Sequence, residues 1–135
     1  MNAALLDTDI LSLYFRNNPK VVFQFQEYLT QYDKIQFSIV TYYEILSGLK
    51  HRDAFKQLTS FLEFSKRSIL LPLTEHSVAL SSDLYASSRK AGRPIDDIDL
   101  LIAGIALSNG FDLVTHNVDH FAWIKELHVM DWSMT

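Results

Sequence analysis

The sequence predicts an α/β fold, with one α/β/α domain over residues 1–135 and a central, mostly parallel sheet of four to five strands. Short apolar runs alternate along the chain with helical patterns, which is the order of strand–helix–strand units. The chain has 135 residues, a length that favours one domain. Its hydrophobic share of 48% is close to the globular average, so the chain can build a buried core.

The first predicted strand is the apolar run at residues 3–6, and a short helix at residues 10–15 follows it. The stretch Asn17, Asn18, Pro19 ends that helix, because asparagine and proline favour turns. Residues 21–29 carry apolar side chains at helical spacing and predict a second helix. Residues 35–40 alternate and are rich in β-forming side chains, which predicts the second strand.

Two helices and a third strand are predicted next. One helix begins at Thr41 and ends near Ser47 and Gly48, and another covers residues 55–64. Residues 68–73 are short and apolar and predict the third strand. Pro72 cannot donate a backbone hydrogen bond, so this strand lies at an edge of the sheet or ends at the proline.

The last third of the chain is predicted to hold two longer helices. Thr74 is placed to cap the first, which runs to about Lys90. The second starts at Asp96 or Asp97, is densely apolar, and has Gly110 as its C-cap. The remaining predicted elements are a strand at residues 111–114, a short helix at residues 121–127 and, as a fifth strand, residues 128–130.

The composition excludes several classes of protein. The chain has no cysteine, which excludes disulfides, cysteine-ligated zinc and thiol catalysis and agrees with the reducing cytoplasm. It has no apolar run long enough to span a membrane and no signal-peptide pattern, so we expect a cytoplasmic protein. The net charge of −4 counts against binding of nucleic acid by a basic surface alone. It counts less against an enzyme whose acids hold metal ions.

Polar side chains follow several of the predicted strands and open one of the helices. In a parallel sheet with right-handed crossovers, the strand-to-helix turns meet at one rim, where ligands bind. Neighbouring carboxylates repel each other unless a cation lies among them, and Mg²⁺ prefers oxygen ligands. The rim is therefore a candidate site for a hard divalent metal. The polar residues expected there are Asp7, Asp9, Thr41, Glu44, Asp96, Asp99, Thr115, Asn117 and Asp119.

Each of these residues also has a purely structural interpretation. Thr41 and Glu44 have the spacing of a capping box, and Asp96 and Asp119 are placed as helix N-caps. Asp9 can serve as first-turn charge on a helix. Asp7 is harder to explain in this way, because an acid directly after a buried strand is unfavourable without a partner. Only the convergence of several groups on one rim indicates a functional site.

Other candidate features are weaker. His116 and His120 are four residues apart, but the loop expected there argues against a shared metal. No Gly-x-Ser-x-Gly elbow and no glycine-rich phosphate-binding loop occurs in the sequence. Basic residues gather at Arg89, Lys90 and Arg93, ahead of Asp99, and this group could contact a phosphate backbone.

Four short segments resemble, in order, the motifs of the PIN-domain family, and in particular of the VapC-type toxins of bacterial toxin–antitoxin pairs. The opening segment contains Asp7, Thr8 and Asp9, and the last contains Thr115 and Asn117. Residues 131–132, Asp-Trp, are also typical of the family. The resemblance covers essentially the whole chain. The four segments are LLDTDIL at residues 5–11, TYYEILSGL at 41–49, IDLLIA at 98–103 and LVTHN at 113–117.

The resemblance implies a PIN-like α/β/α fold and Mg²⁺- or Mn²⁺-dependent endoribonuclease activity that cleaves RNA phosphodiester bonds. It implies control by a small antitoxin of the VapB type, and a homodimer. Carried over by position, Asp7, Glu44 and Asp99 form the acidic core and are the expected metal ligands. Asn117 takes the fourth catalytic position, where many relatives have aspartate.

Two other functions are compatible with parts of the sequence. Asp7 and Asp9 directly after a strand also match the opening Asp-x-Asp of haloacid-dehalogenase-type phosphatases, with Asp7 as nucleophile and Asp9 as acid. The short chain and the segments around Glu44 and Asp99 argue against this class. A PIN-like module that binds protein or RNA without catalysis is the third alternative.

Overall fold

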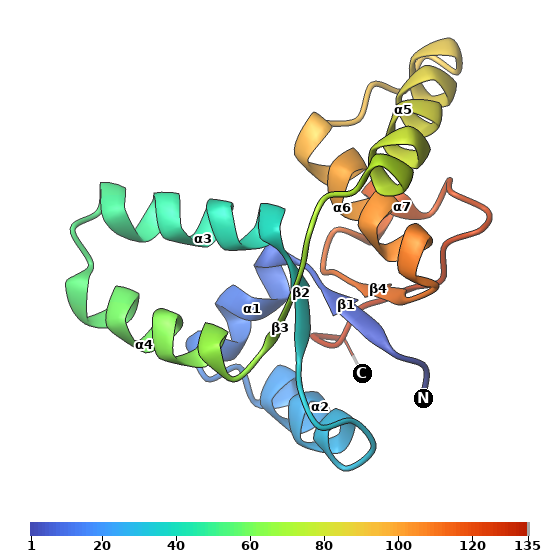
Figure 1. The fold of residues 1–135 in the computed structure, drawn as a ribbon. Helices are drawn as coiled ribbons and strands as arrows, with labels where there is room; N and C mark the ends of the chain where they lie inside the picture. The colour runs from blue at the N-terminus through green and yellow to red at the C-terminus, as the bar shows by residue number, and fades with distance from the viewer. Residues whose placement is uncertain (135) are drawn as a thin grey trace.

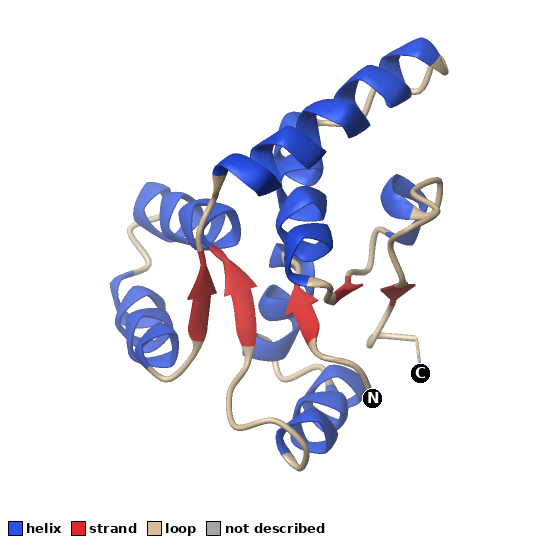
Figure 2. Ribbon diagram, turned by 45° about the vertical axis from the view of Figure 1, so that its right-hand side comes forward, coloured by secondary structure: helices blue, strands red, loops and turns tan. Residues whose placement is uncertain are grey.

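The computed structural model describes residues 1–134, which form a five-stranded sheet with helices on both faces (Figure 1). The strand order is β3-β2-β1-β4-β5, and every neighbouring pair is parallel. The arrows of β1, β2 and β3 accordingly point the same way in Figure 2. The predicted fold class is confirmed, including the edge position of the third strand. The strands are β1 (Ala4–Leu6), β2 (Gln36–Ser38), β3 (Ile69–Leu71), β4 (Asp112–Val114) and β5 (Val129–Met130).

Seven helices connect and cover the strands within the described residues. They are α1 (Thr8–Phe15), α2 (Pro19–Leu29), α3 (Ile39–His51), α4 (Phe55–Lys66), α5 (Glu75–Lys90), α6 (Asp97–Asn109) and α7 (Val118–Phe121). The far end of α5 extends beyond the sheet (Figure 2). Within residues 1–134, no helix combines the length and the apolar character that crossing a membrane requires.

The central strand β1 divides the core into two layers. Ala4 and Leu6 belong to one buried cluster, which includes side chains of α1, α2 and α4. Leu5 belongs to the other cluster, which is built mainly from α6 and the segment after β4. Side chains of a strand alternate between its faces, so three apolar residues in a row are buried only when both faces are covered. This explains why β1 is a continuous apolar run.

The junction between β2 and α3 differs from the prediction. The strand ends at Ser38 rather than at Val40, and the Ser38 hydroxyl oxygen accepts a hydrogen bond from the Thr41 backbone N–H at 3.0 Å. Ser38 is therefore the N-cap, so the predicted capping box of Thr41 and Glu44 is wrong. The helix also continues past Gly48 to His51. A serine with extended backbone can end a strand and cap a helix at once, which apolar alternation alone does not reveal.

The region after β4 also differs from the prediction. The short helix lies at Val118–Phe121, and turns, not the predicted helix, follow as far as Leu127. Asn117 occupies the N-cap position, so the predicted capping role of Asp119 is wrong. Phe121, the last residue of α7, is buried in the second cluster together with Ile124 and Leu127, which continue its helical spacing but lie in the turns that follow. Burial at the end of the sheet therefore overrides the local helical pattern.

The α5–α6 pair is held at close range. Thr74 caps α5, as predicted, and its hydroxyl oxygen accepts the Ser77 N–H at 3.0 Å. A Cβ built on Gly104 of α6 would lie 2.0 Å from Ser81 Oγ, so only glycine permits this approach. Gly110 ends α6 with a φ of 67°, the left-handed conformation predicted for a C-cap.

Candidate functional site

The C-terminal edge of the sheet gathers most of the predicted polar residues. Asp7 directly follows β1, Thr115 directly follows β4, and the first turn of α6 brings Asp99 to the same edge. Glu44 reaches it from α3, through a bond to the first residue of α1. We call Asp7, Asp9, Glu44 and Asp99 the acidic rim. Its position agrees with the general rule that ligands bind at the carboxyl ends of parallel strands.

Asp7 is the most buried member of the acidic rim, with 4% of its surface exposed. One carboxylate oxygen accepts the backbone N–H of Thr8 at 2.8 Å, so Asp7 is the N-cap of α1. The other oxygen accepts the hydroxyl of Thr115 at 2.8 Å. These two bonds fix the carboxylate between the ends of β1 and β4.

Burial raises the pKa of Asp7 to about 7, and the negative charges of Asp9 and, more weakly, Asp99 add to this increase. Hydrogen bonds from Thr115 and Thr8 act in the opposite direction and do not cancel it. A carboxylate whose charged form is unfavourable among other acids gains most from a nearby cation. Asp7 is thus suited to hold a metal ion.

Asp9 belongs to the same hydrogen-bond network as Asp7 and Thr115. The sequence alone left the role of Asp9 open between a helix charge and a site residue. Its Oδ2 accepts the backbone N–H of His116 at 3.0 Å and lies 3.4 Å from Thr115 Oγ1. Its Oδ1 is buried and has no hydrogen-bond partner within the described part of the chain. Burial raises the pKa of Asp9, although hydrogen bonds from the backbone of His116 and Ile10 partly oppose this. The unpaired oxygen is a candidate ligand or water acceptor.

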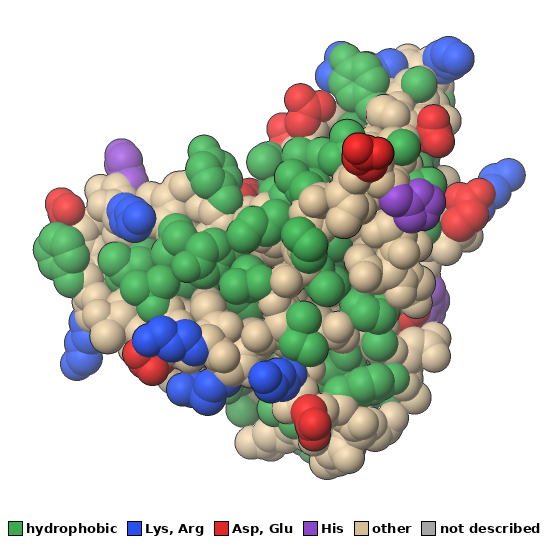
Figure 3. Space-filling model, in the orientation of Figure 1, with side chains coloured by type: hydrophobic (Ala, Val, Ile, Leu, Met, Phe, Trp, Pro, Cys, Tyr) green, Lys and Arg blue, Asp and Glu red, His purple; other side chains and the backbone are tan. Residues whose placement is uncertain are grey.

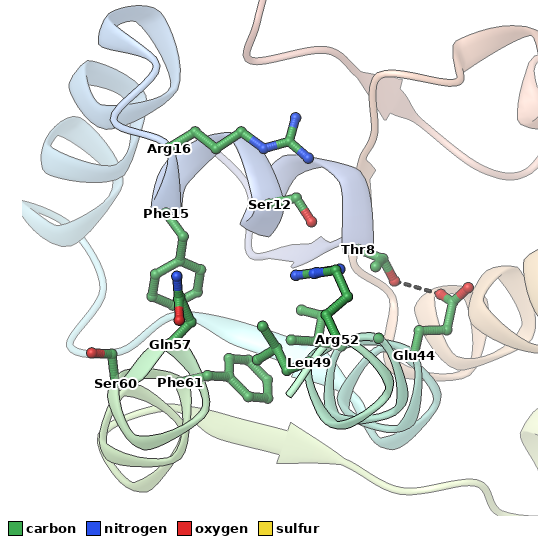
Figure 4. Close-up of a pocket in the computed structure, with 12 residues that line it drawn as sticks. Thr8, Ser12, Phe15, Arg16, Glu44, Leu49, Arg52, Gln57, Ser60 and Phe61 are labelled. Atoms are coloured by element: carbon green, nitrogen blue, oxygen red, sulfur yellow. Dashed lines mark hydrogen bonds between the residues drawn. The ribbon is translucent and has the colours of Figure 1, made fainter. Parts of the chain in front are cut away.

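Glu44 is held by Thr8 rather than by a capping box. The Thr8 hydroxyl donates to Glu44 Oε1 at 2.5 Å, the bond drawn as a dashed line in Figure 4. The hydroxyl oxygens of Thr8 and Thr41 lie 3.2 Å apart. The Thr8 backbone N–H stabilises the turn around Asp7. Its side chain has a second role, which is to join α1 to α3 at the rim.

Asp99 contacts a histidine that sequence reasoning did not connect to it. His120 Nδ1 lies 2.9 Å from Asp99 Oδ2, and both side chains are partly exposed. The two residues are far apart in the sequence, and no local spacing relates them. The imidazole can orient Asp99, as partners of metal-binding carboxylates do.

The remaining predicted site residues, Asn117, Asp119 and Asp96, have no side-chain contact with the acidic rim among the hydrogen bonds of the described residues. Asn117 is exposed, and its backbone N–H donates to Thr115 Oγ1 at 3.0 Å. Asp119 is also exposed, in the first turn of α7. Asp96 precedes α6 but makes no side-chain capping bond. Thr115 therefore supports the acidic rim directly, while Asn117 supports it through Thr115.

The two histidines after β4 contact different carboxylates. His120 faces Asp99, whereas His116 Nδ1 lies 3.0 Å from Asp131 Oδ2. Burial raises the pKa of Asp131, but hydrogen bonds from Ser133 and His116 outweigh this, and the net pKa is lowered. The C-terminal segment thus fastens the loop whose His116 backbone N–H holds Asp9.

The donor set of the acidic rim suits a hard divalent cation. All its side-chain donors are carboxylate oxygens, the ligands that Mg²⁺ and Mn²⁺ prefer. Within residues 1–134, no three acidic or histidine side chains already surround one point as a closed metal cage would. A cation at the rim would nevertheless stabilise the charged form of Asp7, whose pKa is raised, and would give the buried Asp9 Oδ1 a partner.

Comparison with known proteins gives one family for the whole site. The model of the PIN domain matches residues 4–126, which include every member of the acidic rim. The chain is 31% identical over 130 residues to Ribonuclease VapC1 of Haemophilus influenzae strain R2866, covering 96% of this chain and 97% of that protein. It is 28% identical over 130 residues to the tRNA(fMet)-specific endonuclease VapC of Shigella flexneri, covering 96% and 97%.

The fold is also similar to that of solved structures. The 2.2 Å structure of VapBC-1 from nontypeable Haemophilus influenzae aligns with a TM-score of 0.80 and 28% sequence identity. The alignment covers 97% of this chain and 98% of that chain. The similarity in fold and in sequence therefore extends over nearly the entire chain.

Proposed function

Because the chain belongs to the PIN-domain family, and within it to the VapC-type ribonucleases, we propose that it is a divalent-metal-dependent endoribonuclease and the toxin of a toxin–antitoxin pair. The observation that carries the metal dependence is the acidic rim. Asp7 is buried next to Asp9 and within the influence of Asp99, and its pKa is raised to about 7. Such an arrangement is unfavourable unless it serves a ligand, which is typical of active sites.

Asp7, Asp99 and Glu44 are the proposed metal ligands, and Mg²⁺ or Mn²⁺ is the proposed ion. When bound, such an ion supplies activation of a water molecule and stabilisation of charge on the phosphoryl group. Thr115 and the Thr8 backbone N–H hold the carboxylate of Asp7 in place. The Thr8 hydroxyl does the same for Glu44.

Asn117 is proposed as the fourth catalytic residue, in a supporting role. Its backbone N–H fixes the Thr115 hydroxyl that donates to Asp7, which leaves its exposed amide side chain available to substrate or water. His120 is proposed to orient Asp99. Neither residue needs to contact the metal for these roles.

RNA is the proposed substrate, since the relatives in Haemophilus influenzae and Shigella flexneri are named as a ribonuclease and a tRNA endonuclease. A small antitoxin of the VapB type is the proposed partner, because the solved neighbour is a VapBC assembly. The match to the PIN-domain family disfavours the phosphatase alternative. We further propose that the protein is cytoplasmic.

A homodimer is also proposed, and exposed apolar side chains support it. They gather on one side of the molecule, over α3, α4, β3 and α5 (Figure 3). Tyr43 on α3 and Phe55 on α4 are 65% and 70% exposed. Large exposed apolar patches mark surfaces that another chain covers. Light scattering of the partner-free protein gives its mass in solution, and a monomeric mass would contradict the homodimer.

The nuclease proposal is tested with purified, partner-free protein and labelled total RNA, with Mg²⁺, with Mn²⁺ or with a chelator. Discrete fragments are expected only with metal. Asp7→Ala should remove them, whereas Asp83→Ala, at an exposed site on α5, should not. A fully active and folded Asp7→Ala protein would overturn the assignment of the site. Metal-dependent binding of RNA without any cleavage would favour the non-catalytic binding module.

A further inference from the structure

A cavity of about 510 Å³ lies beside the acidic rim, between α1, α3 and α4. Its lining includes Thr8 and Glu44, the pair that joins α1 to α3, and it extends from there past Ser12 to Phe15 and Phe61 (Figure 4). Sites of roughly 300 to 1,000 Å³ hold small organic ligands. The cavity is therefore continuous with the proposed catalytic site and large enough for part of a substrate.

Two arginines reach this cavity from different helices. Arg16 follows the last residue of α1, and Arg52 follows the last residue of α3. A Cβ built on Gly48 would lie 3.5 Å from Arg52 Nη1, so the Arg52 side chain lies back over α3 and across the cavity. Figure 4 shows Arg52 extending toward α1 and Arg16 extending along α1 toward Ser12. We call the cavity with these two side chains the arginine pocket.

The charge of the arginine pocket is not neutralised from within. In the part of the chain that the structure describes, neither guanidinium forms an ion pair with a carboxylate. This is notable in a chain with sixteen acidic and twelve basic residues. A basic residue at a helix C-terminus is favourable by itself, as Arg67 at the end of α4 illustrates. Arg67 does not line the cavity, whereas Arg16 and Arg52 both do.

The walls of the pocket combine an aromatic ring with uncharged polar groups. Phe15 is 39% exposed and lines the cavity, while Phe61 behind it is buried. Gln57 and Ser60 line it from α4. Arginine binds phosphate oxygens in a bidentate manner, and aromatic rings stack on bases whatever their sequence. Amide and hydroxyl groups can hydrogen-bond base edges.

We propose that the arginine pocket binds the nucleotide next to the scissile phosphate, with Arg16 and Arg52 on a phosphate and Phe15 against the base. The proposal rests on the proposed function for the identity of the substrate. A strand whose phosphate lies at the acidic rim approaches several carboxylates, which repel it. Two unpaired cations that line the same cavity as Glu44 offset that repulsion and fix the direction in which the strand runs.

An acidic segment of a protein partner is the alternative occupant. RNA is favoured because the cavity opens onto Thr8 and Glu44 at the catalytic rim, where a substrate must pass. The combination of an accessible ring with two arginines also matches a nucleotide better than an acidic side chain, which needs no aromatic wall.

The test is fluorescence anisotropy with a labelled single-stranded RNA of random sequence. Asp7→Asn serves as the parent protein, because it is expected to bind RNA without cleaving it. Adding Arg16→Ala and Arg52→Ala should weaken binding at least about tenfold and reduce the salt dependence by about 0.7 in log–log slope for each phosphate that is no longer bound. Adding Arg67→Ala instead should change the dissociation constant by less than about twofold, because Arg67 ends a helix outside the pocket.

Phe15→Leu separates base stacking from charge. In the same parent it should weaken binding about threefold to tenfold without changing the salt slope, since a stacked base carries no charge. Equal binding by the parent and the double arginine variant would overturn the proposal. Failure of the parent to bind RNA at all would also overturn it, because the parent keeps the pocket intact.

The remaining outcomes distinguish this inference from the nuclease assignment. If the wild-type protein cleaves RNA but the arginine variants bind RNA as tightly as the parent does, the proposed role of the pocket is wrong and the nuclease assignment is supported. If RNA binding depends on the arginines but the wild-type protein cleaves no RNA, the proposed role of the pocket is supported and the nuclease assignment is wrong. A poly-glutamate peptide that binds only when the arginines are present, together with arginine-independent RNA binding, would assign the pocket to an acidic protein segment.

Discussion

The two edges of the sheet each bury an aspartate, and the two sites are built in opposite ways. At the C-terminal edge, Asp7 is 4% exposed and lies near Asp9 and Asp99. At the N-terminal edge, Asp112 is 7% exposed, pairs in register with Ala4 and lies 3.0 Å from His128 Nδ1. One buried acid faces other acids, and the other faces an imidazole. The difference teaches that burial alone does not distinguish the two acids, whereas the charge of their neighbours does, and burial among like charges is typical of active sites.

The strongest test of this comparison exchanges each aspartate for asparagine. Asp7→Asn keeps the shape of the side chain and the bond accepted from the Thr8 N–H, and its amide can donate to the Thr115 hydroxyl oxygen, but the charge proposed to hold metal is lost. We expect metal-dependent RNA cleavage to fall on the order of 10³-fold or more, as when an essential catalytic group is removed. Asp112→Asn should leave cleavage per folded molecule within about twofold. Equal losses in the two variants would mean that the acidic rim has no special role.

The second test is the pH dependence of stability without divalent metal. Burial raises the pKa of Asp7 from 3.8 to about 7, so the folded state binds more protons than the unfolded state between these values. The free energy of unfolding should therefore fall as the pH rises from about 4 to about 7, and then level off. At about 1.4 kcal/mol per pKa unit, the decrease is on the order of 4 kcal/mol. Asp9, whose pKa is also raised, acts in the same direction.

Denaturant unfolding in the presence of a chelator measures this decrease. Asp7→Asn should remove most of the slope and be more stable than the wild-type protein at pH 8. Asp112→Asn provides the matched control, because it leaves Asp7 and its acidic neighbours in place. If the stability of the wild-type protein is constant between pH 4 and pH 7, then burial and the nearby acids do not raise the pKa of Asp7.

The third test concerns the hydroxyl that holds Asp7. Thr115→Val keeps the volume of the side chain but removes the hydrogen bond to Asp7 Oδ2 and the acceptor of the Asn117 N–H. We expect metal affinity and cleavage to fall about 10- to 100-fold, which is typical when the partner of a metal ligand is removed. Titration calorimetry with Mn²⁺ measures the affinity directly. Unchanged affinity would indicate that Thr115 serves packing alone.

The smallest expected effect comes from the opposite edge. His128→Ala leaves the buried Asp112 without the imidazole, and this should lower the free energy of unfolding by about 1 to 2 kcal/mol. Cleavage per folded molecule should not change, because His128 lies at the other end of the strands. Thermal unfolding and the RNA assay on the same sample check both parts. A loss of cleavage larger than the loss of folded protein would contradict a purely structural role.

Several features of the fold could be predicted because they are encoded locally. The apolar run of β1 before Asp7, the capping threonine Thr74 and the C-cap Gly110 each depend on a few neighbouring residues. Strand–helix alternation then predicts a parallel sheet, and a parallel sheet brings strand ends to one edge. The segments that resemble the PIN-domain family contain the residues that the structure places at that edge, with Asp7 buried and Asp99 acting on it.

Local patterns failed where one residue serves two elements or where burial competes with propensity. Ser38 ends β2 and caps α3, so the alternation through residue 40 gave a strand that is too long. Phe121, Ile124 and Leu127 have helical spacing, yet α7 ends at Phe121, and turns bury Ile124 and Leu127 against the second core cluster. In the first case the observed structure gains a capping hydrogen bond, and in the second it buries apolar side chains. The local sequence pattern indicates neither gain.

The sequence by itself determined the alternation of strands and helices, the parallel sheet and the set of acids proposed to share one metal. The tertiary structure alone decided the strand order and the partners of those acids. Asp9 meets His116 across 107 residues, and Asp99 meets His120 on another element. Arg16 and Arg52 face one cavity only because α1 and α3 pack side by side. Contacts between distant residues depend on how whole elements pack, and no short stretch of sequence contains that information.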